Sequence, residues 1–377
     1  MFREDNSQRG KEISTVSKNL WGVVLAGGEG TRLRNLAMRL YGYHRPKQYC
    51  AITGTQSLIK HTINRASKII PNRKILTVVN SNHARYFKEE LKNQPEETIV
   101  IQPCPRETSA GILLPVSKIH NTDPDSTVAI FPSDHFILEE DKFINYVKEA
   151  CIFVKMNPDL IVLIGVRPDR IESGLGWIER GERIQATNNF KIHRIQKFWE
   201  KPDSIAGASL FNNGCLVNTF IIIGKTKTLI KQIAKQLPHL SRTFEPIREK
   251  MGTPMEKFAI EKFFGSLPEV NFSTDFLQKL NGSLAVMEVP DVYWSDWGEE
   301  QRVVYDIGRF NLSPFKTAEP VLNALAYHKN SSRRTRKPSI KLLKPADYYM
   351  NSSDDYDEYY PPFIKFGHRK MSYKFKP

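Results

Sequence analysis

The sequence has few cysteines and no long hydrophobic run. Its 377 residues include four cysteines, which form no C-x-x-C pair and have no histidine at ligand spacing. This argues against a zinc site or a disulfide framework. No stretch approaches the roughly 20 apolar residues that a bilayer-spanning helix needs, and residues 1–20 lack the apolar core of a signal peptide. We therefore expect a cytoplasmic protein with reduced thiols and no membrane partner.

The net charge of +14 is unevenly distributed. Residues 329–377 carry twelve Lys and Arg against five Asp and Glu, and supply half of the excess. This segment is also rich in Ser, Pro and Tyr, so we expect a disordered tail whose partner is unknown. The mildly basic remainder is common in proteins that handle phosphorylated small molecules. Nucleic-acid binding through the tail is an alternative, but the chain has no recognisable nucleic-acid-binding module, so we expect none.

Apolar runs of strand length alternate with amphipathic stretches in the first half of the chain. Strands are expected at 22–25, 75–79, 99–102, 128–131 and 160–166, with helices at 57–70, 82–91, 108–120 and 142–156. Such alternation predicts a parallel sheet covered on both faces, with ligands at the carboxyl ends of its strands.

The rhythm changes after residue 166. Longer strands are expected at 177–183, 192–199 and 216–223, and helices at 225–236 and 255–264. We interpret these strands as a mixed extension of the same sheet that forms the wall of a second pocket. The sequence has no hexapeptide repeat, so no β-helix is expected.

A glycine-rich loop follows the first expected strand. Its sequence, AGGEGTR at 26–32, has three glycines in four positions, which allows positive φ and a close approach to a ligand. Backbone N–H groups in such a loop bind anions, and Arg32 and Lys47 add positive charge. Leu33 stands where a dinucleotide fingerprint requires glycine, and no Walker motif follows. We interpret the loop as a phosphate-binding site; the alternative is a plain tight turn.

Further motifs follow in a fixed order. They are RPKQ at 45–48, PRETSA at 105–110, FPSDH at 131–135, ESGLGWI at 172–178, FWEKPD at 198–203, NTF at 218–220 and YWSDWG at 293–298. With the glycine-rich loop they resemble the signature of sugar-phosphate nucleotidyltransferases, in detail that of bacterial mannose-1-phosphate guanylyltransferases. The resemblance spans nearly three-quarters of the chain. It implies an α/β fold, with a Rossmann-like, mixed but mostly parallel sheet flanked by helices and no β-helix domain.

The resemblance also divides the chain. A polar extension at 1–20 precedes a nucleotidyltransferase domain at 21–328, and the tail at 329–377 follows. The domain comprises a nucleotide half at about 21–166, a sugar half at about 167–300 and trailing helices to 328.

The activity implied by the resemblance is Mg²⁺-dependent nucleotidyl transfer from a nucleoside triphosphate to a sugar-1-phosphate. The best match is GTP with mannose-1-phosphate, giving GDP-mannose and pyrophosphate by in-line attack on the α-phosphorus. Such transfers need charge neutralised and two polyanions aligned. The implied roles are catalytic for Arg32, Lys47 and Lys201, nucleotide-binding for Ala26, Gly27, Gly28, Gly30, Thr31, Arg106, Thr108, Pro132 and Ser133, and sugar-binding for Gly174, Gly176, Glu200 and Asn218.

Asp134 and Asp296 are the implied ligands of Mg²⁺. Both are carboxylates of the kind that holds this ion between phosphates. The structural alternative is that Asp134 caps the next helix and Asp296 pairs with an arginine. His135 is interpreted as a packed or orienting residue.

The sequence departs from the family pattern at three places, and each affects specificity. Residues 35–44 form a longer connection than usual, Glu107 replaces a frequent Asn, and Thr219-Phe220 replaces Ser-Gly. Glucose-1-phosphate with UTP or dTTP is therefore an alternative substrate pair. A catalytically silent nucleotide-sugar sensor is another alternative, although the expected cations and carboxylates are all present. The oligomeric state, including a homodimer, stays open.

Overall fold

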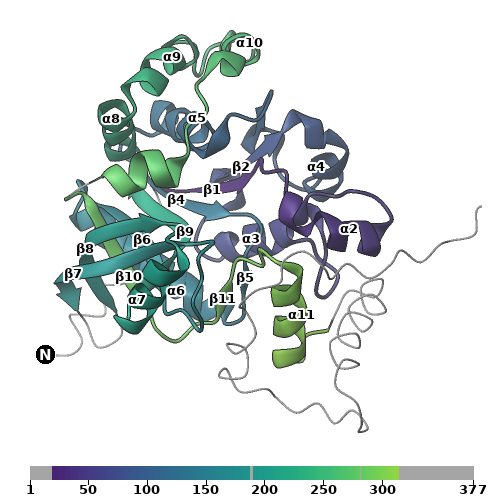
Figure 1. Cartoon of the computed structure of the whole chain (residues 1–377). Helices are drawn as coiled ribbons and strands as arrows, with labels where there is room; N and C mark the ends of the chain where they lie inside the picture. The colour runs from purple at the N-terminus through teal and green to yellow at the C-terminus, as the bar shows by residue number, and fades with distance from the viewer. Residues whose placement is uncertain (1–18, 187–189, 281, 314–377) are drawn as a thin grey trace, which may run out of the picture. The chain divides into compact units, whose positions relative to one another are not determined.

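A parallel sheet forms from the first half of the chain (Figure 1). The computed structural model describes residues 19–186, 190–280 and 282–313. Strand β1 (Leu20–Ala26) pairs in parallel with β2 (Ile75–Asn80) and β4 (Thr127–Pro132), and β2 pairs in parallel with β3 (Ile99–Gln102). The connecting helices are α2 (Arg34–Tyr41), α3 (Leu58–Ser67), α4 (Ala84–Glu90), α5 (Glu107–Thr122) and α6 (Glu140–Met156). The strands expected in this half are confirmed.

The second half extends the same sheet mostly with antiparallel strands. Strand β6 (Ile161–Val166), the last one expected in the first half, pairs in parallel with β10 (Leu284–Val289). The other strands are β7 (Gly176–Ala186), β8 (Lys191–Glu200) and β9 (Leu216–Lys225), in the overall order β3-β2-β1-β4-β9-β6-β10-β8-β7. Strand β9 runs antiparallel to β4, β6 and β7, and β8 runs antiparallel to β7 and β10. A mixed sheet is confirmed, but a mostly parallel one is not. The short connection between β7 and β8 explains why these two strands are antiparallel, because parallel neighbours need a long crossover.

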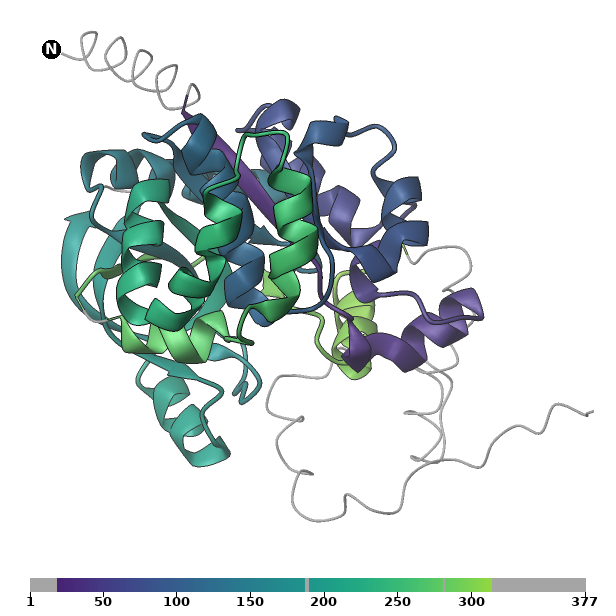
Figure 2. The same ribbon diagram turned by 90° about the horizontal axis from the view of Figure 1, so that it is seen from above.

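Two hydrophobic layers cover the two faces of the sheet. Neighbouring strand residues alternate between them, so that Val24 and Val162 pack on one layer, and Val23 and Leu163 on the other. Helices α3 and α6 cover the first face. The second is covered by α5, α8 (Thr226–Gln236) and α9 (Pro238–Arg248), with α10 (Glu256–Phe263) packed against α9 (Figures 1 and 2). The expected sheet with helices on both faces is thus confirmed.

Several elements differ from the sequence expectation. The connection at 35–44 is largely helical, because α2 buries Leu36, Ala37 and Leu40 and ends at Gly42 in a left-handed conformation. Helices α7 (Ser204–Asn212) and α9 and strand β10 were not expected. Leu20, assigned to the polar extension, already belongs to β1. Residues 1–18 of that extension, the end of the trailing helices and the tail at 329–377 lie outside the described residues.

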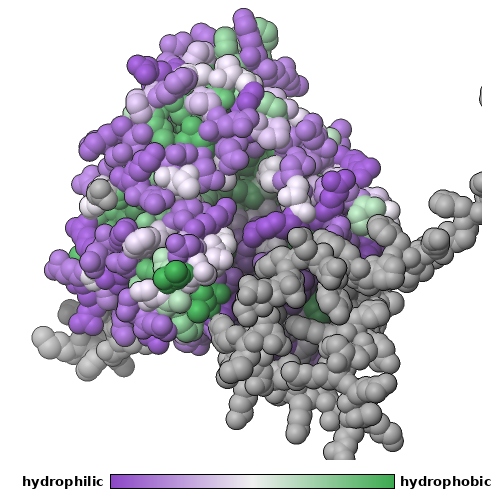
Figure 3. Space-filling model, in the orientation of Figure 1, coloured by the Kyte–Doolittle hydropathy of each residue, from purple (hydrophilic) through white to green (hydrophobic). Residues whose placement is uncertain are grey.

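The surface shown in Figure 3 is mostly hydrophilic, with hydrophobic residues gathered in small patches. One patch lies over α7, where Ile205 is 83% exposed. Within the described ranges, no helix combines the length and apolar character needed to cross a bilayer.

Helix α11 (Glu300–Arg309) fixes the loop that precedes it. The buried carboxylate of Asp306 accepts hydrogen bonds from Trp297 Nε1 at 2.9 Å and Tyr293 Oη at 2.5 Å, and pairs with Arg302 at 3.2 Å. Trp297 stacks on Phe136, with ring centroids 4.5 Å apart. The same loop contributes β11 (Trp294–Ser295), which pairs with β5 (Phe136–Ile137) directly after β4. Two distant segments are thereby joined at the carboxyl edge of the parallel strands.

We expect Asp306→Ala to lower the free energy of unfolding by about 3 kcal/mol, because it leaves Arg302 and two donors without their buried partner. Urea denaturation measures the change. Glu300→Ala is the matched control on the same helix: it removes only a surface pair with Arg39, so less than about 1 kcal/mol is expected. Equal losses in the two variants would contradict the account of α11.

Candidate active site

The glycine-rich loop is held against the segment that carries Lys47. Gly30 has a φ of +62°, and a Cβ added there would lie 2.6 Å from the Lys47 backbone nitrogen. The Gln48 side-chain amide donates to the carbonyl oxygens of Ala26 at 2.9 Å and Gly28 at 2.7 Å. Gln48 therefore positions the loop. The sequence analysis assigned it no role, although it belongs to the RPKQ motif.

Lys47 brings together two carboxylate residues that lie far apart in the sequence. Its side chain is buried, and Nζ lies 3.0 Å from Asp134 Oδ2 while donating to the backbone carbonyl of Asp296. Arg32 completes the group from the other side, with Nη2 3.2 Å from Asp296 Oδ2. The Arg32 side chain is 63% exposed and the Asp296 side chain 16%, so the cation faces solvent above a shielded carboxylate. The four residues expected around the triphosphate and metal therefore form one cluster.

The electrostatic environment keeps Asp134 ionised and His135 neutral. Burial opposes ionisation of the Asp134 carboxyl, but the positive charges of Lys47 and Arg32 outweigh it and hold the pKa of that carboxyl below its usual value. Burial lowers the pKa of His135 to about 4. The imidazole packs edge-on against Trp294, with centroids 5.1 Å apart. This environment agrees with a packing role for His135.

Gly298 lets Arg32 and Asp296 approach each other. A Cβ at this position would lie 2.5 Å from Asp296 Oδ2 and 2.6 Å from Arg32 Nη1. No side chain fits there without moving the pair, because real Cβ atoms are essentially never found that close to another heavy atom. The glycine of the YWSDWG motif thus has a steric role that its spacing alone does not reveal.

The residues expected to bind the sugar form a second cluster. Gly176 opens β7 opposite Glu200 at the end of β8, and a Cβ at Gly176 would lie 3.0 Å from Glu200 Oε2 and 3.5 Å from Asn218 Cβ. Burial raises the pKa of Glu200, although Lys201 and a hydrogen bond with Ser273 oppose the shift. Lys201, which follows Glu200, is exposed. Gly174 makes no comparable close contact, because a Cβ there would meet no atom within 4 Å.

The segment expected on the nucleobase side is tied to the loop before β10. Arg106 donates to Glu269 at 2.9 Å and to the Gly265 carbonyl, and Thr108 Oγ1 accepts from the Phe272 N–H at 2.8 Å. Both predicted base-binding side chains are thus engaged within the fold, and their contact with a base stays a prediction. Ser133, after Pro132, is buried and donates its N–H to the Leu25 carbonyl, so its predicted role also stays a prediction.

Gln102 is a further candidate that the sequence analysis missed. It ends β3 and is buried, and its Nε2 has no hydrogen-bond partner among the described residues. A Cβ at Gly27 would lie 2.6 Å from its Oε1, and one at Gly111 would lie 3.0 Å from its Nε2. A buried amide with an unused donor beside the glycine-rich loop can recognise a ligand. The available signal was its place at the carboxyl end of a parallel strand.

Backbone strain gathers at these motifs. Five described residues other than glycine have a positive φ: Glu107, Lys201, Phe220, Trp297 and Asn311. All except Asn311 belong to motifs recognised in the sequence. Strain of this kind persists where the surrounding structure imposes it, typically at functional sites.

The carboxylates fit a magnesium ion better than a metal that requires a full protein cage. Among the described residues, no group of three or more His, Cys, Asp and Glu could hold a metal. Mg²⁺ commonly takes one or two carboxylates and completes its shell with phosphate oxygens and water, and Asp134 and Asp296 supply that number. The alternative structural role expected for Asp296, pairing with an arginine, is confirmed by its contact with Arg32. Asp134 caps no helix, since α6 begins only at Glu140.

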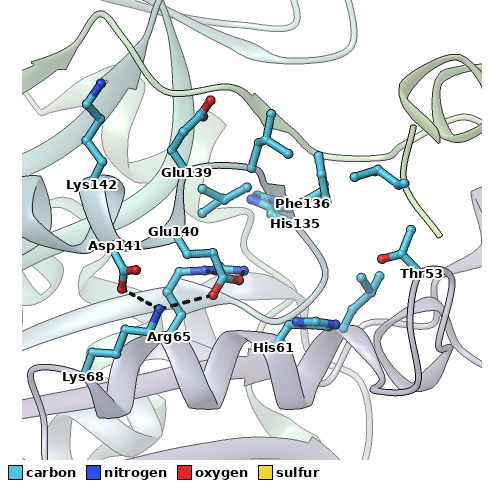
Figure 4. Close-up of a pocket in the computed structure, with 14 residues that line it drawn as sticks. Thr53, His61, Arg65, Lys68, His135, Phe136, Glu139, Glu140, Asp141 and Lys142 are labelled. Atoms are coloured by element: carbon cyan, nitrogen blue, oxygen red, sulfur yellow. Dashed lines mark hydrogen bonds and ion pairs between the residues drawn. The ribbon is translucent and has the colours of Figure 1, made fainter. Parts of the chain in front are cut away.

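A cavity of about 680 Å³ adjoins this site through His135 and Phe136 (Figure 4). Its charged side chains neutralise one another: Lys68 lies 2.8 Å from Asp141, and Arg65 lies 3.0 Å from Glu140. With these cations paired, the cavity lacks the excess positive charge that a triphosphate needs. The cavity is therefore a poor candidate for a triphosphate site.

Two curated proteins are similar to this chain over about three-quarters of its length. A mannose-1-phosphate guanylyltransferase 2 from Escherichia coli O157:H7 is 29% identical over 290 residues, covering 74% of this chain and 58% of that protein. A mannose-1-phosphate guanylyltransferase from Escherichia coli K12 is 27% identical over 289 residues, covering 75% and 59%. The chain thus spans less than two thirds of the length of these relatives.

Solved structures show the same fold. A mannose-1-phosphate geranyltransferase from Thermus thermophilus matches with a TM-score of 0.61 at 20% identity, covering 74% of this chain and 76% of that one. A mannose-6-phosphate isomerase from Helicobacter pylori matches with a TM-score of 0.57 at 18% identity, covering 74% and 99%. The family model described as nucleotidyl transferase matches residues 21–305. This chain belongs to the nucleotidyl transferase family.

Proposed function

We propose that this chain transfers a nucleotidyl group from a nucleoside triphosphate to a sugar-1-phosphate, with GTP and mannose-1-phosphate as the preferred pair. The observation that carries the proposal is the meeting of Arg32, Lys47, Asp134 and Asp296 from motifs up to 264 residues apart. The named relatives support the choice of GTP and mannose-1-phosphate.

The cations have separate tasks in this proposal. Arg32, exposed at the glycine-rich loop, binds the triphosphate and stabilises the charge that develops on departing pyrophosphate. Lys47 neutralises the α-phosphate region, and Lys201 binds the sugar phosphate. The N–H groups of the loop at 26–31 cradle the phosphates. A sugar phosphate has a second pKa near ~6, so at neutral pH it is already a nucleophile and needs no general base. The neutral His135 is consistent with this.

Asp134 and Asp296 would hold Mg²⁺ together with the phosphates of the substrate. The bound ion would neutralise phosphate charge and orient the two substrates. Before substrate binds, the same carboxylates are occupied by Lys47 and Arg32. Binding therefore exchanges protein ion pairs for contacts of these four residues with the ion and the phosphates.

The test is pyrophosphate release by the purified full-length chain with Mg²⁺, measured across four nucleoside triphosphates and a panel of hexose-1-phosphates. We expect the highest rate with GTP and mannose-1-phosphate. A higher rate with UTP or dTTP and glucose-1-phosphate would keep the reaction and change the substrates. No release with any pair would overturn the proposal and favour a catalytically silent sensor.

We expect Arg32→Ala and Asp296→Ala each to lower kcat by roughly 10²–10³-fold, because each removes a charge that faces the transferring phosphate. Steady-state pyrophosphate release measures the effect. Arg39→Ala is the matched control: Arg39 is a nearby arginine on α2 that pairs with Glu300. The assignment fails if Arg39→Ala loses as much activity as Arg32→Ala.

We expect Gly298→Ala to lower kcat by about 10²-fold, since a misplacement of about 1 Å at the reacting groups can cost that much. The added methyl group would push Asp296 and Arg32 apart. Gly308→Ala is the control, because a Cβ there meets no atom within 4 Å and alanine favours its helix. Full activity in Gly298→Ala would show that the Arg32–Asp296 geometry is irrelevant to the rate.

We expect Glu200→Gln to raise the KM for the sugar-1-phosphate at least about tenfold, because it removes a charged acceptor from the sugar cluster, while the KM for the nucleotide stays within about twofold. Initial-rate kinetics with each substrate varied separately measure both constants. Glu179→Gln, at a residue that accepts from Trp199 Nε1 on the neighbouring strand, is the control. A change confined to the nucleotide KM would contradict the assignment.

A further inference from the structure

One residue of the central strand β9 is unlike its neighbours. Of residues 216–224, only Phe220 is not fully buried. Strand β9 lies between β4 and β6 inside a sheet whose faces are covered by helices. Phe220 is partly exposed, although its side chain packs against the second hydrophobic layer. Phe220 also has a φ of +57°, in the left-handed region where a bulky residue is strained.

The register places Phe220 at the carboxyl edge of the parallel strands. The pairing of β9 with β4 ends at Ile222 and Ile130, so Phe220 lies beyond the last paired residues, toward the carboxyl end of β4 at Pro132. On the other side, Asn218 pairs with Gly165 and Ile222 with Leu163, so residues 219–221 oppose only Ile164. Phe220 therefore lies in a bulge. Bulges next to active sites redirect side chains.

The contacts of Phe220 connect it to the sugar cluster. Its ring packs edge-on against Phe272, with centroids 6.3 Å apart, and its N–H donates to Asn218 Oδ1 at 3.1 Å. The residue after Phe272 is Ser273, which hydrogen-bonds to Glu200. Phe220 thus contacts Asn218 directly. It is linked to Glu200 only indirectly, because the Phe272 that it packs against precedes Ser273.

The conformation does not require a phenylalanine. Glycine adopts this φ without strain, and the hydrogen bond to Asn218 uses only the backbone N–H. The backbone geometry therefore explains the bulge but not the ring. A strained aromatic that packs against Phe272 and still keeps exposed surface next to Asn218 is suited to contact a ligand there.

We propose that Phe220 is a specificity-determining residue that closes the sugar pocket beside Asn218 and Glu200. This inference rests on the proposed function. Its ring selects sugar-1-phosphates that place carbon and hydrogen against it, and it disfavours those that place a hydroxyl there, because an aromatic face leaves a hydroxyl without a hydrogen-bond partner.

The test compares the wild type with Phe220→Gly and Phe220→Leu on mannose-1-phosphate, glucose-1-phosphate and 6-deoxymannose-1-phosphate. We expect Phe220→Gly to change the ratio of kcat/KM values between the best and the poorest sugar by about tenfold or more, with the nucleotide KM within about twofold. Phe220→Leu keeps an apolar side chain, so its ratio of kcat/KM values should lie between those of the wild type and Phe220→Gly. If Phe220→Gly fails to fold, as judged by circular dichroism, the leucine variant carries the test.

Asn311→Gly is the matched control, because Asn311 also has a positive φ but lies after α11, outside the motifs. It should leave the sugar ratio unchanged. An active wild type with the same sugar ratio in Phe220→Gly and Phe220→Leu, whatever their melting temperatures, would overturn this inference and leave the proposed function intact. A wild type inactive with every pair would overturn both.

Discussion

The buried ammonium group of Lys47 is the constraint on which the site depends. A charge removed from water must be paired, and this one is satisfied by the Asp134 carboxylate at 3.0 Å and by the Asp296 carbonyl. These contacts join the segment after the glycine-rich loop, the end of β4 and the loop before α11. Two further contacts stabilise the meeting of these segments. Gly30 lets the loop approach Lys47, and Asp306 holds Trp297, the neighbour of Asp296, in place.

The two halves of the site meet through one short segment. Asn271, Phe272 and Ser273 contact Glu107 and Thr108 on the expected nucleotide side, and Phe220 and Glu200 on the expected sugar side. Two substrates that react in line must be held in a fixed relative position. A segment that contacts both halves supplies such a constraint. The positive φ values of Glu107, Lys201 and Phe220 lie around this segment and are consistent with backbone that packing holds in place.

The sequence alone predicted the features that depend on a single strand or a single motif. Apolar runs of fixed length predicted β1 to β4 and β6, because buried parallel strands are apolar on both faces. The direction of β9 could not be read, since its apolar run is compatible with either pairing. Helix α2 was missed because a helix of this length is stabilised by tertiary packing of its apolar residues, here Leu36, Ala37 and Leu40, rather than by its own sequence. The motifs indicated Arg32, Lys47, Asp134 and Asp296. The roles of Gly298 and Gln48 depend on close contacts across the fold, which no local pattern encodes. For Gln102 the only signal was its place at the end of β3.

The central claim is that the cluster around Lys47 directs attack on the α-phosphorus. Incubating the full-length chain with Mg²⁺, mannose-1-phosphate and GTP labelled with ³²P at either the α or the γ position tests it most directly. The account predicts that the α label appears in a nucleotide sugar and the γ label in pyrophosphate, with both transfers strongly slowed in Arg32→Ala. Appearance of the γ label on the sugar phosphate, or release of the γ label as inorganic phosphate without a nucleotide sugar, would contradict it.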